Sequence, residues 1–382
     1  MDFSQHEDDR DLAELTRTIL ADHTSPRRLA EVEATGDRFD RPLWTDLARA
    51  GVLAATLPAS VGGSALGLLA QCGVLVELGR TVAPVPYLPS VVVAAGAIAE
   101  FGTAAQRDAW AAPAAAGELV LTAALAEEVG DDPASPVTAA SSTGDAGASA
   151  RESARWHLHG TKVAVHAGPV ADLFLVPAET ADGLTVFLVT PGDSGVTVRR
   201  QVVVDGDAEA VLELDHVELG ADRVLGSPGA GAPVVEWLVA HATVGICAHQ
   251  LGISEAALQM TAKYATGRVQ FDRPIATFQA VGQRLADCYI DVEAIRLTLW
   301  QAAWRLSENM PSHTEIATAK FWAADGGHRV AHAAVHVHGG LGIDVDYPLH
   351  RYFVAAKRNE FSLGGATSQL RRIGVALAAE PA

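Results

Sequence analysis

The spacing of apolar residues changes twice along the chain, and this change constrains the fold more than any other feature of the sequence. Up to about residue 118, apolar residues recur every three or four positions, as in Leu12–Leu20, which is typical of helices. Between about residues 119 and 226 the period drops to two, which indicates short strands. From about residue 227 the helical spacing returns over long stretches. The sequence therefore predicts an α+β fold with an N-terminal helical domain (1–118), a small middle β-barrel or β-sandwich domain (119–226) and a C-terminal antiparallel helical bundle (227–382).

Local signals place individual elements within the two helical zones. A helix is expected to open at Pro42, because a proline in the first turn loses no hydrogen bond. A turn over Leu57–Gly63 precedes the apolar run Leu66–Leu78. In the last zone, apolar residues recur at helical spacing over Ile275–Leu306, and Ser312-x-x-Glu315 is a capping-box signature that opens the next helix.

The middle zone contains candidate strands separated by Gly, Pro or Asp. Trp156–Gly160 and Val163–Val165 predict a hairpin. The other expected strands are Leu173–Val176, Thr185–Val189, Val196–Val204 and Val211–Leu214. The stretch Asp131–Glu152 is rich in Ser, Ala, Gly and Asp, and we expect it to be a mobile loop.

Charge and composition exclude several classes of function. The formal net charge of −18 argues against nucleic acid or an anionic membrane as the main partner, although a few placed arginines can still bind a phosphorylated ligand. Charged or polar side chains interrupt the most apolar long run, Val234–Ile253, so a buried helix is expected there instead of a membrane span. Residues 1–12 lack the pattern of a signal peptide, and Cys72, Cys247 and Cys288 are expected to be buried free thiols of a cytoplasmic protein.

Several common motifs are missing from the sequence. No Gly-x-Gly-x-x-Gly follows a strand, which argues against a Rossmann nucleotide site, and Gly-x-Ser-x-Gly is absent. His332, His336 and His338 are closely spaced, but no Cys or carboxylate cluster lies beside them in the sequence. Packing roles are therefore favoured over metal ligation, and no metal site is predicted.

Two segments of the C-terminal zone carry candidate ligand-binding residues. The first is Tyr264–Ile275, which reads YATGRVQFDRPI and is followed by Phe278-Gln279. Arg268 suits a phosphate through charge-assisted hydrogen bonds, although a surface arginine at a turn between helices would look the same. The second is His336–Gly342, followed by Asp346-Tyr347-Pro348, where paired glycines permit a close approach of backbone to ligand or serve only to end a helix.

These two segments resemble the acyl-CoA dehydrogenases, and shorter matches extend the resemblance across nearly the whole chain. Leu57–Gly63 is similar to the family's Leu-Pro-Glu-x-Tyr-Gly-Gly turn, and Trp156–Lys162 is similar to its Trp-x-x-x-Gly-x-Lys hairpin. Val224–Gly226 is similar to its Val-Leu-Gly loop, and Thr367–Gln369 with Arg372 is similar to its Thr-Ser-Glu/Gln tail.

The resemblance implies the family's fold, with an antiparallel four-helix bundle at the C-terminus, assembled as a dimer or tetramer. It also implies an FAD that is shared between neighbouring subunits. The residues expected to contact this FAD are Arg268, Gln270, Phe271, Gln279, His336, Gly339, Gly340, Trp156, Thr367 and Gln369. His336 stands where the family has a glutamine.

The glutamate that the family uses as its catalytic base is missing. In the family it removes the α-proton of an acyl-CoA thioester while the β-hydride passes to the flavin. The corresponding segment here is Phe361-Ser-Leu-Gly364-Gly365-Ala-Thr367, so Gly364 or Gly365 occupies the glutamate's position. The candidate replacements are Glu360, which would need an unusual backbone path, and Glu236, which neighbours the position that some relatives use but points about a quarter turn away.

The side expected to hold the flavin ring also departs from the family pattern. The family's Thr-Glu-Pro segment reads Ala126-Glu127-Glu128, and Leu158 stands where a Thr or Ser is common. The leading hypothesis is therefore a non-catalytic subunit of a heterotetramer that desaturates an acyl-CoA thioester. This chain would donate contacts to the FAD pyrophosphate, and a second acyl-CoA dehydrogenase subunit would supply the base.

Three alternatives stay open at this point. The chain could be a homomeric acyl-CoA dehydrogenase with a displaced base, a flavin-dependent monooxygenase on the same fold, or a structural subunit without flavin. The first two readings keep the flavin and differ in the chemistry that follows. In a dehydrogenase, electrons would pass on to an electron-transferring flavoprotein or a similar acceptor.

Overall fold

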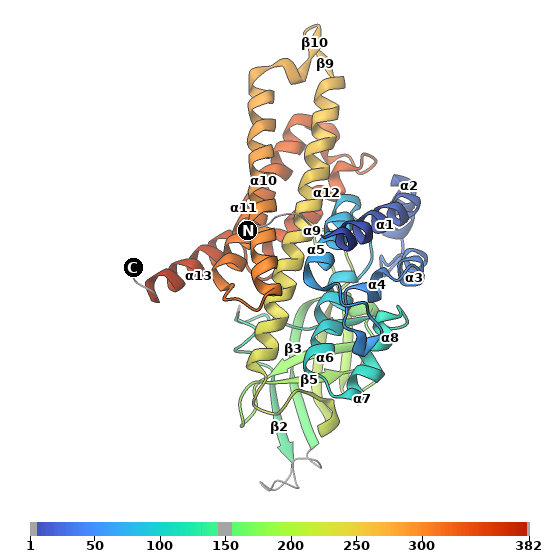
Figure 1. The fold of residues 1–382 in the computed structure, drawn as a ribbon, viewed down its shortest axis with the longest axis vertical. Coiled ribbons are helices and arrows are strands. Elements are labelled where there is room, and N and C mark those ends of the chain that lie inside the picture. Colours follow the sequence, from blue (N-terminus) through green and yellow to red (C-terminus); the bar gives the residue numbers. More distant parts are fainter. Residues whose placement is uncertain (1–5, 131, 144–154, 380–382) are drawn as a thin grey trace. The chain divides into compact units, whose positions relative to one another are not determined.

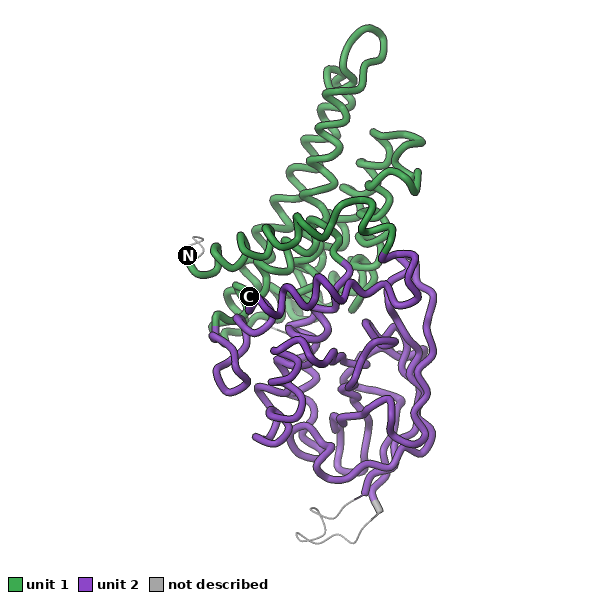
Figure 2. The backbone as a smooth tube through the Cα atoms, turned by 90° about the vertical axis from the view of Figure 1, so that its right-hand side faces the viewer, with its two compact units in different colours: residues 1–31, 66–83, 243–382 green, residues 32–65, 84–242 purple. Residues whose placement is uncertain are grey.

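The computed structural model describes residues 6–130, 132–143 and 155–379. The chain divides into two compact units, each built from segments that lie far apart in the sequence (Figure 2). The helical unit comprises residues 1–31, 66–83 and 243–382, and the sheet unit comprises residues 32–65 and 84–242. The domain boundaries expected at residues 118 and 226 follow the order of elements along the chain, and they stay predictions.

Helices occupy both ends of the described chain and the two four-stranded sheets occupy its middle, which confirms the predicted order; the two-residue strands β9 and β10 lie among the C-terminal helices. The helices are α1 (Glu7–His23), α2 (Pro26–Glu33), α3 (Arg41–Arg49), α4 (Val52–Ala55), α5 (Gly67–Thr81), α6 (Gly96–Phe101), α7 (Ala104–Gln106), α8 (Ala112–Ala115), α9 (Ala232–Gly267), α10 (Gln279–Ser307), α11 (His313–His338), α12 (Leu349–Phe361) and α13 (Ala366–Ala379) (Figure 1). The strands are β1 (Leu121–Ala123), β2 (Ala139–Thr143), β3 (Arg155–His166), β4 (Leu173–Ala178), β5 (Thr185–Val189), β6 (Val196–Gln201), β7 (Glu209–Gly220), β8 (Val224–Leu225), β9 (Val269–Gln270) and β10 (Arg273–Pro274).

Glycines allow α5 and α9 to pack closely in the helical unit. A Cβ atom added to Gly79 of α5 would lie 2.1 Å from the carbonyl oxygen of His249 in α9. In the same way, a Cβ on Gly252 of α9 would lie 2.0 Å from the carbonyl oxygen of Val76 in α5. Because both separations are far below van der Waals contact, any larger residue at either position would force the two helices apart.

The long C-terminal helices form the antiparallel bundle that the sequence predicts. α10 buries Cys288, Val292, Ile295 and Leu299 at the expected spacing. The helix itself begins at Gln279, because Ile275–Thr277 form a 3₁₀ turn and Phe278 adopts an extended backbone with φ −78° and ψ 131°. The expected start at Ile275 was therefore wrong by one turn.

The next helix begins where the capping box predicts, but without the predicted bonds. Ser312 is the N-cap residue of α11, yet its side chain makes no capping hydrogen bond. Glu315 instead forms an ion pair with Arg305 of α10, at 3.3 Å. The tertiary ion pair has thus replaced the local reciprocal bonds of a capping box.

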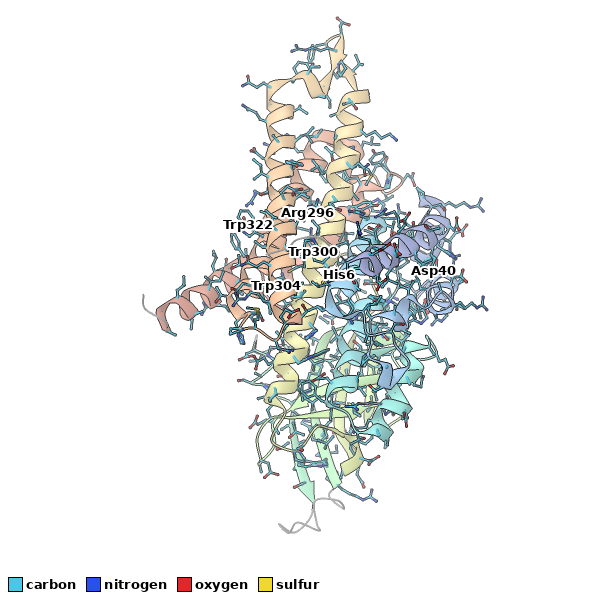
Figure 3. All side chains as sticks on the ribbon, in the orientation of Figure 1. His6, Asp40, Arg296, Trp300, Trp304 and Trp322 are labelled. Atoms are coloured by element: carbon cyan, nitrogen blue, oxygen red, sulfur yellow. The ribbon has the colours of Figure 1, made fainter. Side chains whose placement is uncertain are left out.

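A half-buried acidic residue connects three helices of the same unit. Glu255 of α9 accepts a hydrogen bond from Nε of Arg80 in α5 at 2.7 Å, and it pairs at 2.6 Å with Arg296 of α10, which Figure 3 labels. Two arginines on one carboxylate compensate the cost of removing its charge from water. This network fixes the register of α5, α9 and α10.

The sheet unit contains two open four-stranded sheets, so the middle domain is a sandwich and no closed barrel forms in the described chain. The strand orders are β1-β4-β5-β8 and β2-β3-β7-β6. Inward-facing side chains from both sheets share one core, in which Trp156 of β3 meets Phe187 of β5 edge-to-face at 5.4 Å. The same unit also contains helical segments. One of them is α3, which has Asp40 as its N-cap and Pro42 in its first turn, as the sequence predicts.

Two expectations about the middle zone were wrong. The predicted hairpin Trp156–Val165 is one continuous strand, β3, whose register against β7 shifts twice. Glycine and small residues at those shifts imitate a turn in the sequence, whereas β-bulges keep the strand running. The predicted loop Asp131–Glu152 contains β2, which pairs with β3, while residue 131 and residues 144–152 lie outside the described residues.

Two further observations concern the apolar and sulfur-containing residues. No helix within the described ranges is long and apolar enough to cross a membrane. Cys72, Cys247 and Cys288 are buried and free, as expected from the sequence. Burial raises the pKa of each of these thiols, which keeps them protonated and makes them poor nucleophiles.

Candidate functional site

The first candidate segment forms an exposed hairpin between α9 and α10 (Figure 1). β9 and β10 pair across a two-residue turn in which Phe271 (φ 53°) and Asp272 (φ 63°) both adopt left-handed backbone. Two left-handed residues in succession define a type I′ turn, which is unusual without glycine or asparagine. The Phe271 side chain is 87% exposed at the tip, so this hairpin presents a large apolar residue outward.

Polar candidates lie on the same hairpin and are also exposed. Arg268 directly follows α9, Gln270 lies in β9 and Gln279 opens α10, and all three side chains face solvent. Arg273 makes a cation–π contact at the base of the hairpin, where its guanidinium lies 4.2 Å from the ring centroid of Phe278. The structure therefore gathers these predicted residues on one protruding element of the helical unit.

The second candidate segment lies beside the first. α11 ends at His338, and Gly339 follows with φ 64° and ψ −140°, a backbone conformation that favours glycine. Gly339 and Gly340 are exposed, and a Cβ atom added to either would meet no atom within 4 Å. His336, one turn back, is exposed. This segment thus leaves open space beside its backbone.

His338 joins the two segments, and the sequence analysis did not identify this role. Its ring stacks on Tyr264 of α9 at 4.3 Å between centroids. Its Nδ1 lies 2.8 Å from the carbonyl oxygen of Ala334, and its Nε2 lies 3.3 Å from the hydroxyl of Tyr347. Burial lowers the pKa of His338, which favours the neutral ring. No pattern in the sequence indicated this role of His338, because it depends on packing against residues of other segments.

The C-terminal candidates Thr367 and Gln369 differ in accessibility. Thr367 is exposed, whereas Gln369 is fully buried in the first turn of α13, against the segment that joins α12 to α13. Gln369 donates from Nε2 to the carbonyl oxygens of Leu363 and Gly364, both at 3.1 Å. Among the residues that the structure describes, its Oε1 has no hydrogen-bond partner. Gln369 therefore closes the turn and keeps one buried acceptor unused.

The two glycines expected at the position of the family's base differ in the space that their surroundings leave for a side chain. Gly364 has a left-handed φ of 94°, and a Cβ there would lie 3.1 Å from Cβ of Ser368. At Gly365 a Cβ would lie 3.6 Å from the carbonyl oxygen of Glu360, which is ordinary contact. Space is therefore available at Gly365, while Gly364 is required by the turn.

Glu360 is held away from a role as base by its partners. Its carboxylate pairs with Lys357 at 2.6 Å and lies 3.1 Å from Nδ1 of His328. Burial tends to raise the pKa of Glu360, but the hydrogen bonds from Lys357 and His328 outweigh it, so the pKa is lowered. A carboxylate with a lowered pKa binds a proton weakly, which makes it a poor general base.

The other candidate base lies on the first turns of α9. Glu236 is exposed there, next to the buried Val235. Because neighbouring side chains on a helix point in different directions, burial of Val235 directs Glu236 toward the outer face.

The Trp156 motif has structural functions inside the sheet unit. Trp156 is buried, and within the described chain its indole Nε1 has no hydrogen-bond partner. Gly160 has φ 154°, and a Cβ there would lie 2.5 Å from Oγ1 of Thr138, so the position requires glycine. Lys162 is fully buried and donates from Nζ to Glu127 at 2.6 Å.

Glu127 accepts hydrogen bonds from two neighbouring segments. Besides Lys162, its Oε1 accepts from the amide of Thr138 at 2.9 Å and from the Thr138 hydroxyl at 2.6 Å. Burial tends to raise the pKa of Glu127, but the hydrogen bonds from Lys162, Thr138 and the Val137 amide outweigh it and lower the pKa to about 2. Glu127 therefore ties the segment after β1 to β3, a role that the sequence analysis missed.

Comparisons with known proteins agree with this architecture. Residues 6–118 match the family model for the acyl-CoA dehydrogenase N-terminal domain, and residues 229–378 match the model for the acyl-CoA dehydrogenase C-terminal domain. Acyl-CoA dehydrogenase FadE27 of Mycobacterium tuberculosis is 48% identical over 390 residues, covering 100% of both chains. A chain of the ChsE4-ChsE5 complex from Mycobacterium tuberculosis is 49% identical with a TM-score of 0.93, covering 100% of both chains. A chain of the steroid acyl-CoA dehydrogenase Tcur3481-Tcur3483 is 42% identical with a TM-score of 0.89, covering 98% of both chains.

Proposed function

Because the chain belongs to the acyl-CoA dehydrogenase family, we propose that it is the base-lacking subunit of a heteromeric, FAD-dependent acyl-CoA dehydrogenase. The observation that carries this proposal is an asymmetry within the helical unit. The hairpin with Arg268 and Gln270 is exposed and equipped with polar donors. In contrast, the segment Phe361–Gln369 contains no carboxylate, and the neighbouring Glu360 is committed to Lys357 and His328.

Several features of the chain fit an FAD. Arg268 suits a pyrophosphate, since a guanidinium can donate two parallel hydrogen bonds to phosphate oxygens. Gly339 and Gly340 leave space beside their backbone for a ligand to approach closely. In the sheet unit, the buried Nε1 of Trp156 lacks a partner within the described chain, as an indole beside a ring system with acceptor atoms would.

The roles of this chain would then be binding and positioning. When bound, FAD would accept the hydride that leaves the β-carbon of the acyl-CoA thioester. Arg268 and Gln270 would hold the phosphate end of the cofactor, and Phe271 would cover apolar surface of the neighbouring subunit. The base that removes the α-proton would come from the second subunit, because the residues of this chain at that place are Gly364 and Gly365.

Relatives support an assembly of two different chains. The similar chain of known structure belongs to a complex named for two components, ChsE4 and ChsE5. The second similar structure is a steroid acyl-CoA dehydrogenase that also carries a paired name, Tcur3481-Tcur3483. By analogy, we propose a second acyl-CoA dehydrogenase chain as the partner, a bulky acyl-CoA thioester as the substrate and an electron-transferring flavoprotein or similar protein as the acceptor.

The alternatives fit the structure less well. A homomeric enzyme with a displaced base would need Glu360 or Glu236, and the lowered pKa of Glu360 disfavours it. A structural subunit without flavin gives no reason for the exposed polar hairpin. A monooxygenase would use the same cofactor contacts, and nothing in the described residues favours it over desaturation.

Co-expression tests this proposal directly. The chain is purified alone and together with a second acyl-CoA dehydrogenase chain encoded beside it, and flavin absorbance and dye-coupled acyl-CoA oxidation are measured. We expect flavin and activity only in the mixture. Full activity of the chain alone would refute the proposal.

Two variants of this chain locate the cofactor contact within the mixture. Arg268→Ala removes a charge-assisted hydrogen bond worth about 1.5–3 kcal/mol, so flavin affinity should fall roughly tenfold to hundredfold. Arg284→Ala removes an equally charged, exposed residue from α10 and serves as the matched control, with flavin affinity unchanged. Equal effects of the two variants would show that Arg268 acts only through general charge.

A further inference from the structure

Two histidines and an aspartate come together on the outer face of the sheet β2-β3-β7-β6. They are His159 of β3 and the consecutive pair Asp215 and His216 of β7. Oδ1 of Asp215 lies 3.8 Å from Nδ1 of His159 and 3.8 Å from Nε2 of His216. One ligand atom from each residue lies within 4.8 Å of the other two. The proposed function leaves this group of side chains unused.

A β-bulge creates this arrangement. Leu158 pairs with Val217 and Gly160 pairs with Leu214, so the single residue His159 faces two residues of β7. Consecutive residues of a regular strand point to opposite faces, but a bulge turns both extra side chains toward the same side. His216 accordingly has a left-handed φ of 52°, and the amide of Asp215 donates to the carbonyl oxygen of Gly195 at 2.9 Å.

The residue types and distances suit a divalent transition metal. Imidazole and carboxylate ligands favour Zn²⁺ and neighbouring ions, whereas Ca²⁺ and Mg²⁺ prefer oxygen ligands alone. Zinc bonds to nitrogen and oxygen of about 2.0–2.2 Å place tetrahedral ligand atoms roughly 3.3 Å apart. The three side chains are 70–79% exposed, so their ligand atoms can approach one another without displacing packed neighbours.

We propose that His159, Asp215 and His216 form a binding site for Zn²⁺ or a similar divalent transition metal. The exposed position leaves at least one coordination position to water or to a ligand from another molecule. A bound ion would connect β3 to β7 at the bulge, which is the point where the ladder between these central strands is interrupted. Because His159 lies 56 positions before the pair Asp215 and His216, no short motif in the sequence indicates the site.

Metal titration of the full-length chain tests the proposal. The protein is stripped with a chelator and titrated with Co²⁺ by visible absorption and with Zn²⁺ by calorimetry. We expect one equivalent of metal to bind, with the visible spectrum of Co²⁺ in a nitrogen and oxygen site. Absence of stoichiometric binding up to millimolar metal would overturn the proposal.

Substitutions assign the ligands. His159→Ala, Asp215→Asn and His216→Asn should each weaken binding at least about tenfold, and asparagine at 216 tolerates the left-handed backbone. His157→Ala, two residues before His159 on the same face of β3, is the matched control and should bind metal as the wild type does. Metal-free melting curves of all variants verify the fold. Unchanged binding in the three ligand variants would contradict the assignment.

Discussion

Replacing Glu127 by glutamine removes the negative charge from a buried ion pair while changing its shape very little. Oε1 of Glu127 lies 2.6 Å from Nζ of Lys162, whose side chain is fully buried. The glutamine oxygen can still accept hydrogen bonds from Thr138. The new amide nitrogen, however, faces the backbone N–H of Val137, which in the wild type donates a hydrogen bond to the carboxylate of Glu127. The variant therefore leaves a buried ammonium without its counter-charge.

Two routes give a similar magnitude for the effect. Breaking a buried ion pair by removing one partner costs about 3–5 kcal/mol. Independently, the pKa of Glu127 is lowered from 4.5 to about 2, and a shift of roughly 2.5 units corresponds to about 3 kcal/mol of stability. Burial lowers the pKa of Lys162 despite the pair, so the abandoned lysine can lose its proton, which limits the cost. We expect the free energy of unfolding to fall by about 3 kcal/mol.

The pH dependence supplies a sharper test than the magnitude. Because the pKa of Glu127 is lower in the folded than in the unfolded chain, its contribution is fully present above pH 4.5 and disappears as the pH falls toward 2. The difference between wild type and Glu127→Gln should therefore be constant from neutral pH down to about 5 and shrink below that. Urea unfolding at a series of pH values measures it.

A double-mutant cycle and a control complete the experiment. Lys162→Met added to Glu127→Gln removes the unpaired ammonium, so the double variant should be more stable than Glu127→Gln alone. Glu128→Gln changes the exposed neighbouring carboxylate and should alter stability by less than about 0.5 kcal/mol. If Glu127→Gln lowers the free energy of unfolding by less than about 1 kcal/mol, or if the difference from wild type does not shrink below pH 5, the reasoning is refuted.

Two further predictions concern the C-terminal end of α12. Gly364→Ala should lower the free energy of unfolding by about 1–3 kcal/mol, because Gly364 has φ 94° and an added Cβ would lie 3.1 Å from Ser368. The control Gly365→Ala should change the free energy of unfolding by less than about 0.5 kcal/mol. Thermal melting of the two variants compares these effects. Lys320 is fully buried and donates hydrogen bonds to the carbonyl oxygens of Asn359 and Glu360. Burial lowers its pKa from 10.5 to about 8, so between these pH values Lys320 is protonated in the unfolded chain and deprotonated in the folded chain. Its contribution should therefore make the wild type more stable as pH rises through that window, and Lys320→Met should lack this rise; equal pH profiles would contradict the assignment.

The sequence was a good guide to elements whose own residues determine them. The spacing of Cys288, Val292, Ile295 and Leu299 predicted the buried face of α10, because helical periodicity is a local property. It was a poor guide where partners decide the outcome. The capping box at Ser312 gave the start of α11 but not its bonds, because Glu315 found Arg305 instead. The predicted hairpin became β3, because pairing with β7 absorbs the irregular residues as bulges.

The candidate site shows the same division. Motifs in the sequence selected Arg268, Gln270, Gly339 and Gly340, and their contacts with a cofactor stay predictions. Sequence spacing gave no sign that His338 would stack on Tyr264 and so join the two motifs. It also gave no sign that Glu127 would be the partner of Lys162.

By itself the sequence determined the family and the order of helices and strands, because both depend on residue identity and local period. It also predicted the loss of the base. Only the tertiary structure decided which charges are paired. Glu360 became a poor base through Lys357 and His328, residues on the same and on a neighbouring helix. Likewise, His159, Asp215 and His216 met through a bulge. Such properties depend on the distance between side chains and on their removal from water, and both are fixed only when the chain has folded.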